Sequence, residues 1–396
     1  MAMRRPPLLA AALFVALPMC LHADGGFIPV IHGIAESADQ RAVIIDRGDS
    51  ETIVLQTAYE GDAADFAWVI PLPARVTRAD IGTADPAMFT TLEELTAPRM
   101  LRVAGVGGVR ACGCAGSGGA HVEDGVTVWE TLRVDGYDVA VLSAEDSANL
   151  SGWLSTHGYA LPDGNEATLA HYVTQGWYFV ALKIAPTPRR NTGGVDGAPG
   201  GYTGEELRPI TLSFATDQLV FPMRISRLST RERVEVLLYV LSDHRAAGEN
   251  YPTAEVDAPA SYAGGDFRGA YEGWLEGTLT AAGGRALAVE WAGWVGGWSL
   301  SGPAFAELEL PDEGCYLTRL RTRLRPAQME EDIVLAAAAS DERFEVVLDD
   351  GYAQARGSAA LAMLALTVPP GFLLRSRRTR RLSLAGVLCA LLIVLL

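Results

Sequence analysis

Runs of alternating apolar and polar residues, or of continuously apolar residues, recur along the chain between turn-forming segments. Residues 51–60, for example, are rich in β-branched and aromatic side chains and run into the turn Glu60-Gly61-Asp62, which is typical of a strand. The same criteria predict strands over residues 27–34, 41–47, 51–60, 65–72, 126–134, 137–143, 177–184, 208–215, 219–228, 233–242, 305–310, 316–324 and 343–348. We therefore expect a body made mostly of sheet.

Three segments show helical spacing of apolar residues instead. The first begins at Asp85-Pro86, where an N-cap residue and a first-position proline favour a helix start, and it ends before Pro98. The other two cover residues 145–157 and 164–174. Because these helices interrupt runs of strands and do not alternate regularly with them, we predict an α+β fold, a mostly antiparallel β-sheet body with inserted helices.

Two segments are predicted loops, and a third has no clear period. Residues 102–125 are rich in glycine, and residues 186–204 are rich in proline, glycine and asparagine. Residues 244–305 carry four tryptophans, Trp274, Trp291, Trp294 and Trp298. We predict that this segment is partly helical and that its tryptophans pack in the core. An aromatic ligand platform and a membrane-proximal belt are the alternatives.

The first 23 residues resemble a secretory signal. Arg4-Arg5 precedes an apolar run from Leu8 to Leu17, and Ala23 is a small residue just before a cleavage point at Asp24. The apolar run is too short to span a bilayer comfortably. We therefore predict an N-terminal signal helix over residues 1–23 and export of the rest of the chain.

The last 40 residues predict attachment to a membrane. Residues 357–374 are uncharged and nearly all apolar, and as a helix they would reach roughly 27 Å. An arginine cluster follows at residues 375–381, and a second apolar run covers residues 382–396. The cluster comprises Arg375, Arg377, Arg378, Arg380 and Arg381. Since such a cluster stays in the cytoplasm, a span at 357–374 would place the preceding body outside.

Both ends of the chain thus predict one orientation, with the body on the extracytoplasmic, periplasmic side of the cell membrane. The predicted segments are a signal peptide at 1–23, an N-terminal α+β part at 24–185, a loop at 186–206, a C-terminal β-rich part at 207–356 and a membrane tail at 357–396. The pattern leaves open whether residues 382–396 cross the membrane.

Composition and charge describe a folded and acidic body. Hydrophobic residues make up 49% of the chain and charged residues 20%, which excludes a disordered chain. The formal charge is −16, and because the two ends carry seven arginines and no acid, residues 24–356 carry −23. Binding of phosphates needs lysine and arginine. The sequence therefore predicts no nucleic-acid partner.

The cysteines offer the clearest candidate chemistry. The chain has five, Cys20, Cys112, Cys114, Cys315 and Cys389, of which three belong to the body. Cys112 and Cys114 are separated by one residue, and His121 follows seven residues later. Such a group could bind zinc or copper, or its thiols could form an easily reduced disulfide. The interpretation we favour is a structural disulfide from Cys112 or Cys114 to Cys315, with no cofactor predicted.

Motifs of the common enzyme classes are missing from the sequence. It has no Walker A loop, dinucleotide fingerprint, H-E-x-x-H motif or nucleophile elbow. Lys183 is the only lysine among 32 basic residues, which we attribute to coding bias. No motif therefore indicates an enzyme.

Several sequence blocks occur in an order that resembles a known family. The blocks are Asp24 to Phe27, Leu55 to Gly61, Asp65 to Pro73, Leu92 to Arg99, Trp177 to Lys183 and Tyr316 to Leu320. Together they resemble the bacterial family catalogued as domain of unknown function 2330 over most of residues 24–350. The resemblance implies one shared fold, export and often a membrane segment, and it assigns no activity. Members often begin with a cysteine where this chain has Asp24.

We therefore predict a membrane-anchored extracytoplasmic protein that binds or scaffolds a protein or cell-wall partner and has no enzymatic activity. Membrane lipid would contact it through the C-terminal tail. The alternative is a thiol redox or metal-handling protein that uses Cys112, Cys114 and His121. A hydrolase is a third hypothesis, which no motif supports.

Overall fold

The computed structural model describes residues 26–27, 40–56, 67–100, 121–123, 125–159, 161, 164–184, 208–230, 232–262 and 266–348. The chain divides into two compact units. The larger comprises Met1–Arg99, Ala104–Ala258 and Arg268–Val347, and the smaller comprises Met100–Val103, Pro259–Phe267 and Leu348–Leu396. In the smaller unit the Tyr262 hydroxyl donates a hydrogen bond to the backbone oxygen of Asp266 at 2.9 Å. The sites discussed below belong to the larger unit.

The first sheet has six antiparallel strands in the order β1-β4-β10-β9-β8-β7. They are β1 (Gly26–Phe27), β4 (Ala67–Leu72), β7 (His121–Glu123), β8 (Val126–Val134), β9 (Tyr137–Ala144) and β10 (Tyr178–Ile184). The hairpin between β8 and β9 places both turn residues at positive φ, Asp135 at 35° and Gly136 at 92°. An Asp-Gly pair favours such a turn.

The second sheet has nine strands, in the order β15-β16-β17-β13-β2-β3-β11-β5, with β19 also paired to β16. They are β2 (Gln40–Asp46), β3 (Ser50–Gln56), β5 (Ile81–Thr83), β11 (Ile210–Ala215), β13 (Val234–Ser242), β15 (Thr253–Glu255), β16 (Leu287–Val295), β17 (Cys315–Leu324) and β19 (Phe344–Glu345). Two of its pairs, β13 with β2 and β15 with β16, are parallel. Strands from both predicted parts of the body therefore share one sheet.

Among the described residues, the remaining elements are short strands, 3₁₀ turns and five α-helices. A three-stranded sheet contains β12 (Leu219–Phe221), β18 (Ile333–Ala337) and β14 (Ala246–Gly248). Two further strands are β6 (Arg99–Met100) and β20 (Val347–Leu348). The helices are α1 (Ala87–Thr96), α2 (Ser147–Thr156), α3 (Glu166–Thr174), α4 (Met223–Ser226) and α5 (Phe267–Ala281).

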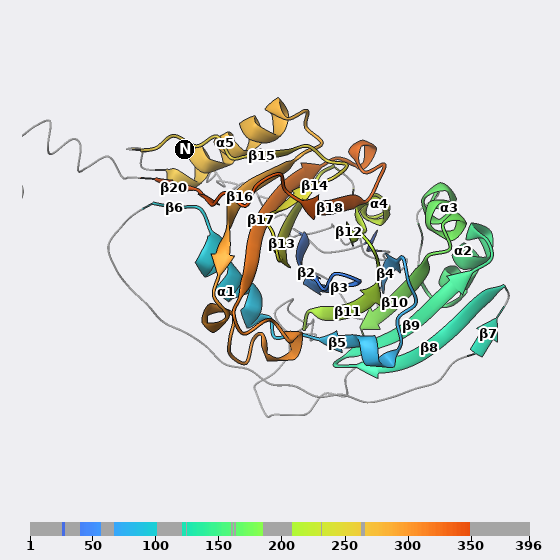
Figure 1. Cartoon of the computed structure of the whole chain (residues 1–396). Coiled ribbons are helices and arrows are strands. Elements are labelled where there is room, and N and C mark those ends of the chain that lie inside the picture. Colours follow the sequence, from blue (N-terminus) through green and yellow to red (C-terminus); the bar gives the residue numbers. More distant parts are fainter. Residues whose placement is uncertain are drawn as a thin grey trace, which may run out of the picture. The chain divides into compact units, whose positions relative to one another are not determined.

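Apolar cores on both faces of the two large sheets hold these layers together. The central core lies between the sheets and joins residues such as Ile70 and Val141 of the first to Ile44 and Leu238 of the second. Helices α2 and α3 cover the other face of the six-stranded sheet. Helix α1 covers part of the other face of the nine-stranded sheet (Figure 1), where its Phe89 belongs to an outer core. Alternation along each strand thus serves two cores at once.

The prediction of a mixed α+β fold made mostly of strands is confirmed for the described residues. Strand β8 at 126–134 has the predicted bounds, and most other predicted strands shift by one or two residues. Within the described ranges no helix is both long and apolar enough to cross a membrane. The predicted signal peptide, the loop at 186–206 and the membrane tail lie outside the described residues.

The predicted strand at 219–228 is wrong in its second half. Strand β12 ends at Phe221, and after Pro222 the chain forms α4. The backbone amide of Arg224 donates to the buried Asp332 carboxylate at 2.8 Å, so this amide is unavailable to a sheet ladder. A distant carboxylate thus fixes the local structure.

Three further segments differ from the prediction. Within the predicted strand at 305–310, Ala306–Leu308 form a 3₁₀ turn, because Phe305 and Leu308, three positions apart, are both buried in the outer core. The predicted loop at 102–125 includes strand β7 near its end. Residues 244–305 contain α5 as expected, and they also contain three strands that the sequence did not indicate.

Glu51 on β3 is a fully buried carboxyl with one unpaired oxygen. The backbone amide of Val220 donates to its Oε2 at 2.7 Å, and Oε1 has no hydrogen-bond partner within the described residues. Burial raises the pKa of Glu51 well above its usual value, the Val220 amide lowers it, and the Asp46 charge raises it further. Because the folded state holds this proton more tightly than the unfolded chain, stability falls as pH rises above the ordinary carboxyl pKa.

Glu51→Gln is therefore expected to stabilise the protein more at higher pH. The amide still accepts the Val220 hydrogen bond but no longer titrates. Thermal midpoints of variant and wild type should be close near pH 5. Near pH 8 the variant should melt about 1–3 °C higher, the shift that about 1–2 kcal/mol produces in a domain of more than 300 residues. A midpoint difference that does not change with pH would contradict the raised pKa.

Candidate functional site

Most residues predicted to carry chemistry lie outside the described residues. These are Cys112, Cys114 and the arginine cluster Arg375, Arg377, Arg378, Arg380 and Arg381. His121 begins β7 opposite Val128, and its side chain is not described. Among the described side chains no three His, Cys, Asp or Glu residues are grouped to hold a metal ion. Metal binding or redox chemistry at Cys112, Cys114 and His121 therefore stays a prediction.

Cys315 is the one predicted cysteine whose side chain can be described. It lies buried at the start of β17 and forms no disulfide with another described residue. Burial, with a smaller contribution from the Asp243 charge, raises the pKa of this thiol to about 11. Little thiolate forms at neutral pH, so the group is a poor nucleophile. A bridge to Cys112 or Cys114 stays a prediction.

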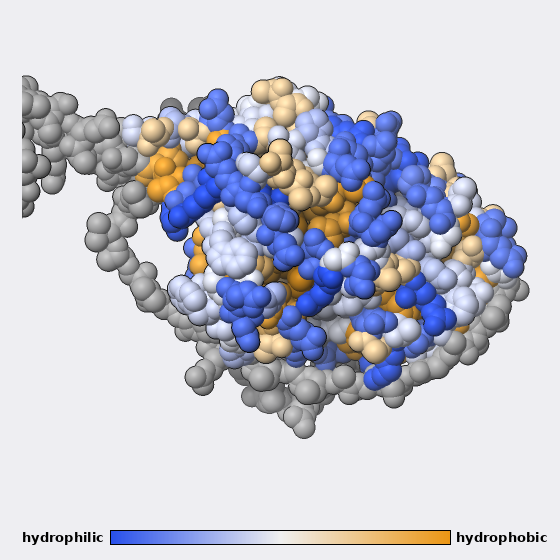
Figure 2. All heavy atoms as spheres, in the orientation of Figure 1, coloured by the Kyte–Doolittle hydropathy of each residue, from blue (hydrophilic) through white to orange (hydrophobic). Residues whose placement is uncertain are grey.

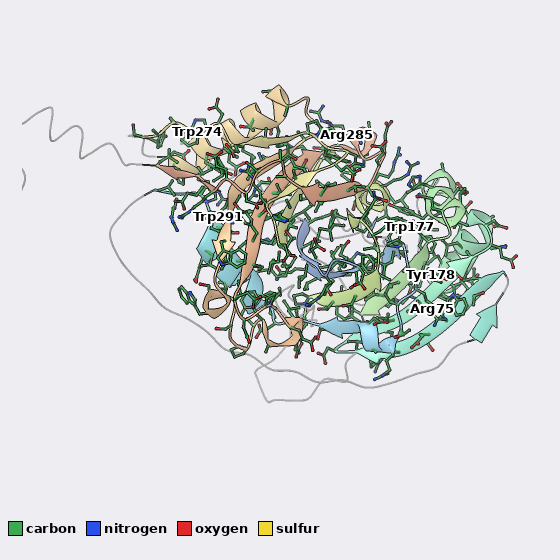
Figure 3. The ribbon with its side chains drawn as sticks, in the orientation of Figure 1. Arg75, Trp177, Tyr178, Trp274, Arg285 and Trp291 are labelled. Atoms are coloured by element: carbon green, nitrogen blue, oxygen red, sulfur yellow. The ribbon has the colours of Figure 1, made fainter. Side chains whose placement is uncertain are left out.

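The four tryptophans of residues 274–298 do not form one cluster in the core. Trp274 on α5 is half-buried and Trp291 on β16 is buried in the outer core (Figure 3). Trp294 at the end of β16 is 57% exposed and Trp298 is 84% exposed. Core packing is thus confirmed for Trp291 and wrong for Trp294 and Trp298. Large aromatic side chains this exposed are candidates for contact with a partner.

Residues 294–314, here called the indole loop, connect β16 to β17 and are held by their own apolar side chains. Leu300, Phe305 and Leu308 are buried in the outer core. The guanidinium of Arg47 donates to the backbone oxygens of Leu308 and Glu309, the latter at 3.0 Å. Trp298 is therefore presented by an anchored loop.

The two ends of the indole loop cross so closely that glycine is needed there. A Cβ on Gly297 would lie 2.1 Å from the backbone oxygen of Asp312. A Cβ on Gly314 would lie 2.1 Å from the backbone oxygen of Val295, and the φ of Gly314 is +107°. This crossing fixes the base of the loop directly beside Trp298.

Gly314→Ala is expected to destabilise the protein more than Gly302→Ala. Gly302 also has a positive φ, +129°, but a Cβ there meets open space. The control should cost about 1–2 kcal/mol of backbone strain, and Gly314→Ala should cost a further 1–3 kcal/mol or so of overpacking. Urea unfolding measures both. Equal losses of unfolding free energy in the two variants would show that the close backbone contact at Gly314 adds nothing to the cost of the substitution.

The charge of the indole loop is entirely negative. Its exposed ionisable side chains are Glu307, Glu309, Asp312 and Glu313, and residues 294–314 contain no arginine or lysine. Hydrophilic residues occupy most of the face of the molecule visible in Figure 2, with hydrophobic residues in smaller patches between them. The loop therefore combines two exposed indoles with a local excess of carboxylates.

A second group of charged residues lies on the outer face of the nine-stranded sheet, and Arg319 of β17 is at its centre. Arg319 is 1% exposed. Its Nε donates to Glu290 Oε2 on β16 at 2.5 Å, and its terminal nitrogens donate to Glu93 and Thr96 of α1 at 3.1 and 3.2 Å. Arg319 thus joins α1 to two strands.

The next two arginines along β17 extend this network towards α5. Arg321 donates to the second oxygen of Glu290 at 2.8 Å and also to Glu235 of β13. Arg323 donates to Glu235 and to Glu272 of α5. Alternate residues of one strand therefore form a continuous ladder of ion pairs.

The pKa values of this ladder are strongly shifted, as at many catalytic centres. Burial alone would raise the pKa of Glu290, but Arg321 and Arg319 lower it to about 2. Burial would likewise raise the pKa of Glu93, and Arg319 lowers it. Both oxygens of Glu290 accept hydrogen bonds from arginines, so neither is free to act as a base. We interpret the ladder as structural.

Exposure of Trp294 and Trp298 was not predicted, although the sequence carried a signal. Gly293 and Gly296-Gly297 surround the two tryptophans, which weakens the case for a packed strand. The run of acids without a single basic residue was also visible. Neither signal distinguishes an exposed indole from a buried one, because exposure depends on which side chains of the loop pack into the core.

The fold and these surfaces together define an α+β protein with two packed sheets and an exposed aromatic and acidic loop. The chain belongs to the family described as "Uncharacterized protein conserved in bacteria (DUF2330)", whose model matches residues 21–336. This confirms the resemblance found in the sequence. No curated protein matches the chain.

Two solved structures show a distant likeness. The crystal structure of baculovirus P35 shares 8% identity, with 75% of this chain and 96% of that chain covered and a TM-score of 0.33. A mutated baculovirus P35 after caspase cleavage shares 7% identity, with 76% and 99% covered and a TM-score of 0.30. At these scores the likeness carries no argument about fold or function.

Proposed function

We propose that this protein is a membrane-tethered, extracytoplasmic binding protein and that its indole loop contacts a partner protein with a basic surface. One observation carries the proposal: Trp298 is 84% exposed on a loop anchored by buried side chains. An indole left in water forgoes a large apolar burial. Tryptophan is also among the residues that dominate binding energy at protein interfaces.

The charge of the loop supports a basic protein as the partner. Four exposed carboxylates lie within residues 294–314, which contain no basic residue, and they outnumber the single guanidinium of Arg47 that contacts the loop backbone. Complementary charge speeds encounter and excludes wrong partners. An anionic membrane surface would repel these carboxylates. A cell-wall glycan is the competing occupant, and it is one outcome of the test below.

The proposed location is supported by the two ends of the sequence. Residues 1–23 have the pattern of a signal peptide, and residues 357–396 place an arginine cluster between two apolar runs. Both patterns favour an exported body with its tail in the membrane. A scaffold or binding role fits this placement because the tether would hold the loop near other envelope proteins.

Photo-crosslinking from position 298 tests the proposed contact. A benzophenone amino acid replaces Trp298 in the full-length protein in its native envelope, and the control places it at the exposed Glu166 of α3. We expect one discrete protein adduct from position 298 that position 166 does not give. The crosslinked peptide should contain more arginine and lysine than aspartate and glutamate. The same adducts from both positions, or adducts with glycan alone, would contradict the proposal.

A further inference from the structure

A cleft of about 480 Å³ lies on the outer face of the six-stranded sheet, at the C-terminal end of α2. Its volume falls within the roughly 300–1,000 Å³ of small-molecule sites in proteins. Strands β8, β9 and β10 supply the floor, and Trp153, His157 and Tyr159 supply one wall. The residues that line the cleft include none of the indole loop and none of Cys112, Cys114 and His121.

A row of three charged side chains crosses the floor of the cleft. The strand register places Arg133 opposite Asp138 and Asp138 opposite Lys183. Their neighbours Val139 and Leu182 point into the central core, so the charged side chains point to the outer face. Arg133 donates two hydrogen bonds to Asp138, at 2.9 and 3.2 Å. Lys183 makes no hydrogen bond or ion pair with Asp138. It lies at the other end of the row from Arg133, against the C-terminal end of α2.

The Lys183 ammonium is held between the end of α2 and an aromatic ring. It donates to the backbone oxygen of His157, the C-cap residue of α2, and lies 4.6 Å from the ring centroid of Tyr159. An ammonium has three N–H groups. One serves the His157 oxygen and the Tyr159 ring lies beside the group, so a donor remains for a ligand in the cleft.

The wall above this ammonium is aromatic. The rings of Trp153 and His157 stack at 3.9 Å with an interplanar angle of 18°, and the Tyr159 ring lies 6.1 Å from that of Trp153. A Cβ on Gly158 would lie 3.1 Å from the lysine nitrogen, and the φ of Gly158 is +75°. The glycine therefore leaves space for a compact ammonium, whereas a planar guanidinium is wider. This geometry gives a reason for a lysine in a chain that otherwise uses arginine.

The surroundings make this amine unlike an ordinary surface lysine. Burial lowers the pKa of Lys183, and the Asp138 charge partly opposes that effect. A perturbed group in a cleft with apolar walls is a common sign of a ligand site. The charges of Arg133 and Lys183, less that of Asp138, give the cleft a net charge of +1, whereas the body as a whole carries −23.

We propose that this cleft binds a small organic carboxylate, with the carboxylate on the Lys183 ammonium and an apolar body against Trp153 and Tyr159. One net positive charge suits a monoanion, since Asp138 would repel a second negative charge. The aromatic wall favours a ligand with an apolar portion over a bare ion. A lysine that only caps α2 would need neither the open donor nor the cleft.

Lys183 is the only lysine in the chain, so amine chemistry gives a residue-specific test in the full-length protein. Formaldehyde and cyanoborohydride methylate free amines, and mass spectrometry of the Lys183 peptide follows the rate. We expect 3-phenylpropionate to slow this methylation saturably. The neutral 3-phenylpropionamide should need at least about a tenfold higher concentration, because it lacks the charge-assisted hydrogen bond. Inorganic phosphate should give no saturable protection.

Three results would overturn the proposal. Equal protection by the acid and the amide would show that the ammonium does not recognise the carboxylate. Absence of saturable protection at millimolar acid would leave Lys183 with only its helix-capping contact. Protection by phosphate equal to that by 3-phenylpropionate would show a general anion site without an apolar subsite.

Variants separate binding from structure. Asp138→Asn removes the negative charge beside the proposed carboxylate and should lower the half-protecting concentration about two- to fivefold. Glu166→Gln on α3, outside the cleft, should leave it unchanged. If Lys183 only caps α2, the acid gives no saturable protection in either variant. A weaker effect of the acid in Asp138→Asn would contradict the proposed position of the carboxylate.

Discussion

Glu290→Ala is expected to lower the free energy of unfolding by about 3–5 kcal/mol, the usual cost of removing one partner of a buried ion pair. Glu290 is fully buried on β16 and accepts hydrogen bonds from Arg319, Arg321 and the Tyr271 hydroxyl of α5. Its loss would leave the buried Arg319 without its closest carboxylate. Both α5 and the centre of the nine-stranded sheet would be weakened.

Glu331→Ala is the matched control for this loss. Glu331 also pairs with an arginine, Arg285, but its side chain is 56% exposed. An exposed pair contributes about 0–1 kcal/mol, so urea unfolding should barely distinguish this variant from wild type. If the two substitutions cost the same, burial of the ladder has no energetic consequence and our interpretation of it is wrong.

Lowering the pH should reduce the free energy of unfolding of the wild type more than that of Glu290→Ala. The pKa of Glu290 is lowered to about 2 in the folded state, below the value of about 4.3 for an unperturbed glutamate. The stabilisation from Glu290 is therefore complete above the unfolded pKa and is lost as pH falls towards 2. The stability difference between wild type and Glu290→Ala should shrink over the same interval.

Replacing Trp294 and Trp298 together by alanine is expected to weaken binding of the partner identified from position 298 by at least about a hundredfold. Tryptophans at the centre of an interface often cost about 2 kcal/mol or more each when truncated, and their effects are not additive. Calorimetric titration of the purified full-length protein with that partner measures the loss. Unchanged affinity would exclude the indole loop as the contact surface.

Stability measurements show whether such a loss reflects the interface. Because both indoles are exposed, the double variant should unfold within about 0.5 kcal/mol of wild type. Trp291→Ala, three residues before Trp294, removes a buried ring and should cost about 3–5 kcal/mol. A double variant as unstable as Trp291→Ala would make its binding defect uninformative.

Local sequence signals were sufficient to predict an element where the residues that end or begin it are adjacent to it in the sequence. Strand β8 was predicted at its observed bounds, and the structure shows that Asp135 and Gly136, the two residues after it, both adopt the positive φ of a hairpin turn. Helix α1 was also predicted, but it begins one residue later than expected, at Ala87 with Pro86 as its N-cap. Asp85 nevertheless accepts a hydrogen bond from the amide of Ala87 at 2.9 Å.

The failures arose where a distant residue decides the local conformation. Arg224 lies in a helix because its amide bonds to Asp332, 108 positions away. Residues 305–310 alternate as a strand would, but Phe305 and Leu308 both find space in the outer core. Glu290 interrupts an apolar strand, and its partners Arg319 and Arg321 are 29 and 31 positions away. A single sequence does not identify such partners.

The candidate sites were less predictable than the fold. Trp291 and Trp298 have the same chemistry and differ only in what packs over them, which depends on how the indole loop is anchored. Lys183 was attributed to coding bias, and its interest comes from the strand register beside Asp138 and from the end of α2. Composition can single out a residue of this kind, but only its neighbours show what it can bind.

The compartment of the body is the most direct test of the account. Alkaline phosphatase, which is active only after export, or green fluorescent protein, which does not fluoresce after unfolded export, is inserted between Arg356 and Gly357 of the full-length chain. We predict high phosphatase activity and no fluorescence. Bright fluorescence with inactive phosphatase would place the indole loop in the cytoplasm and contradict the proposed tethered, extracytoplasmic binding protein.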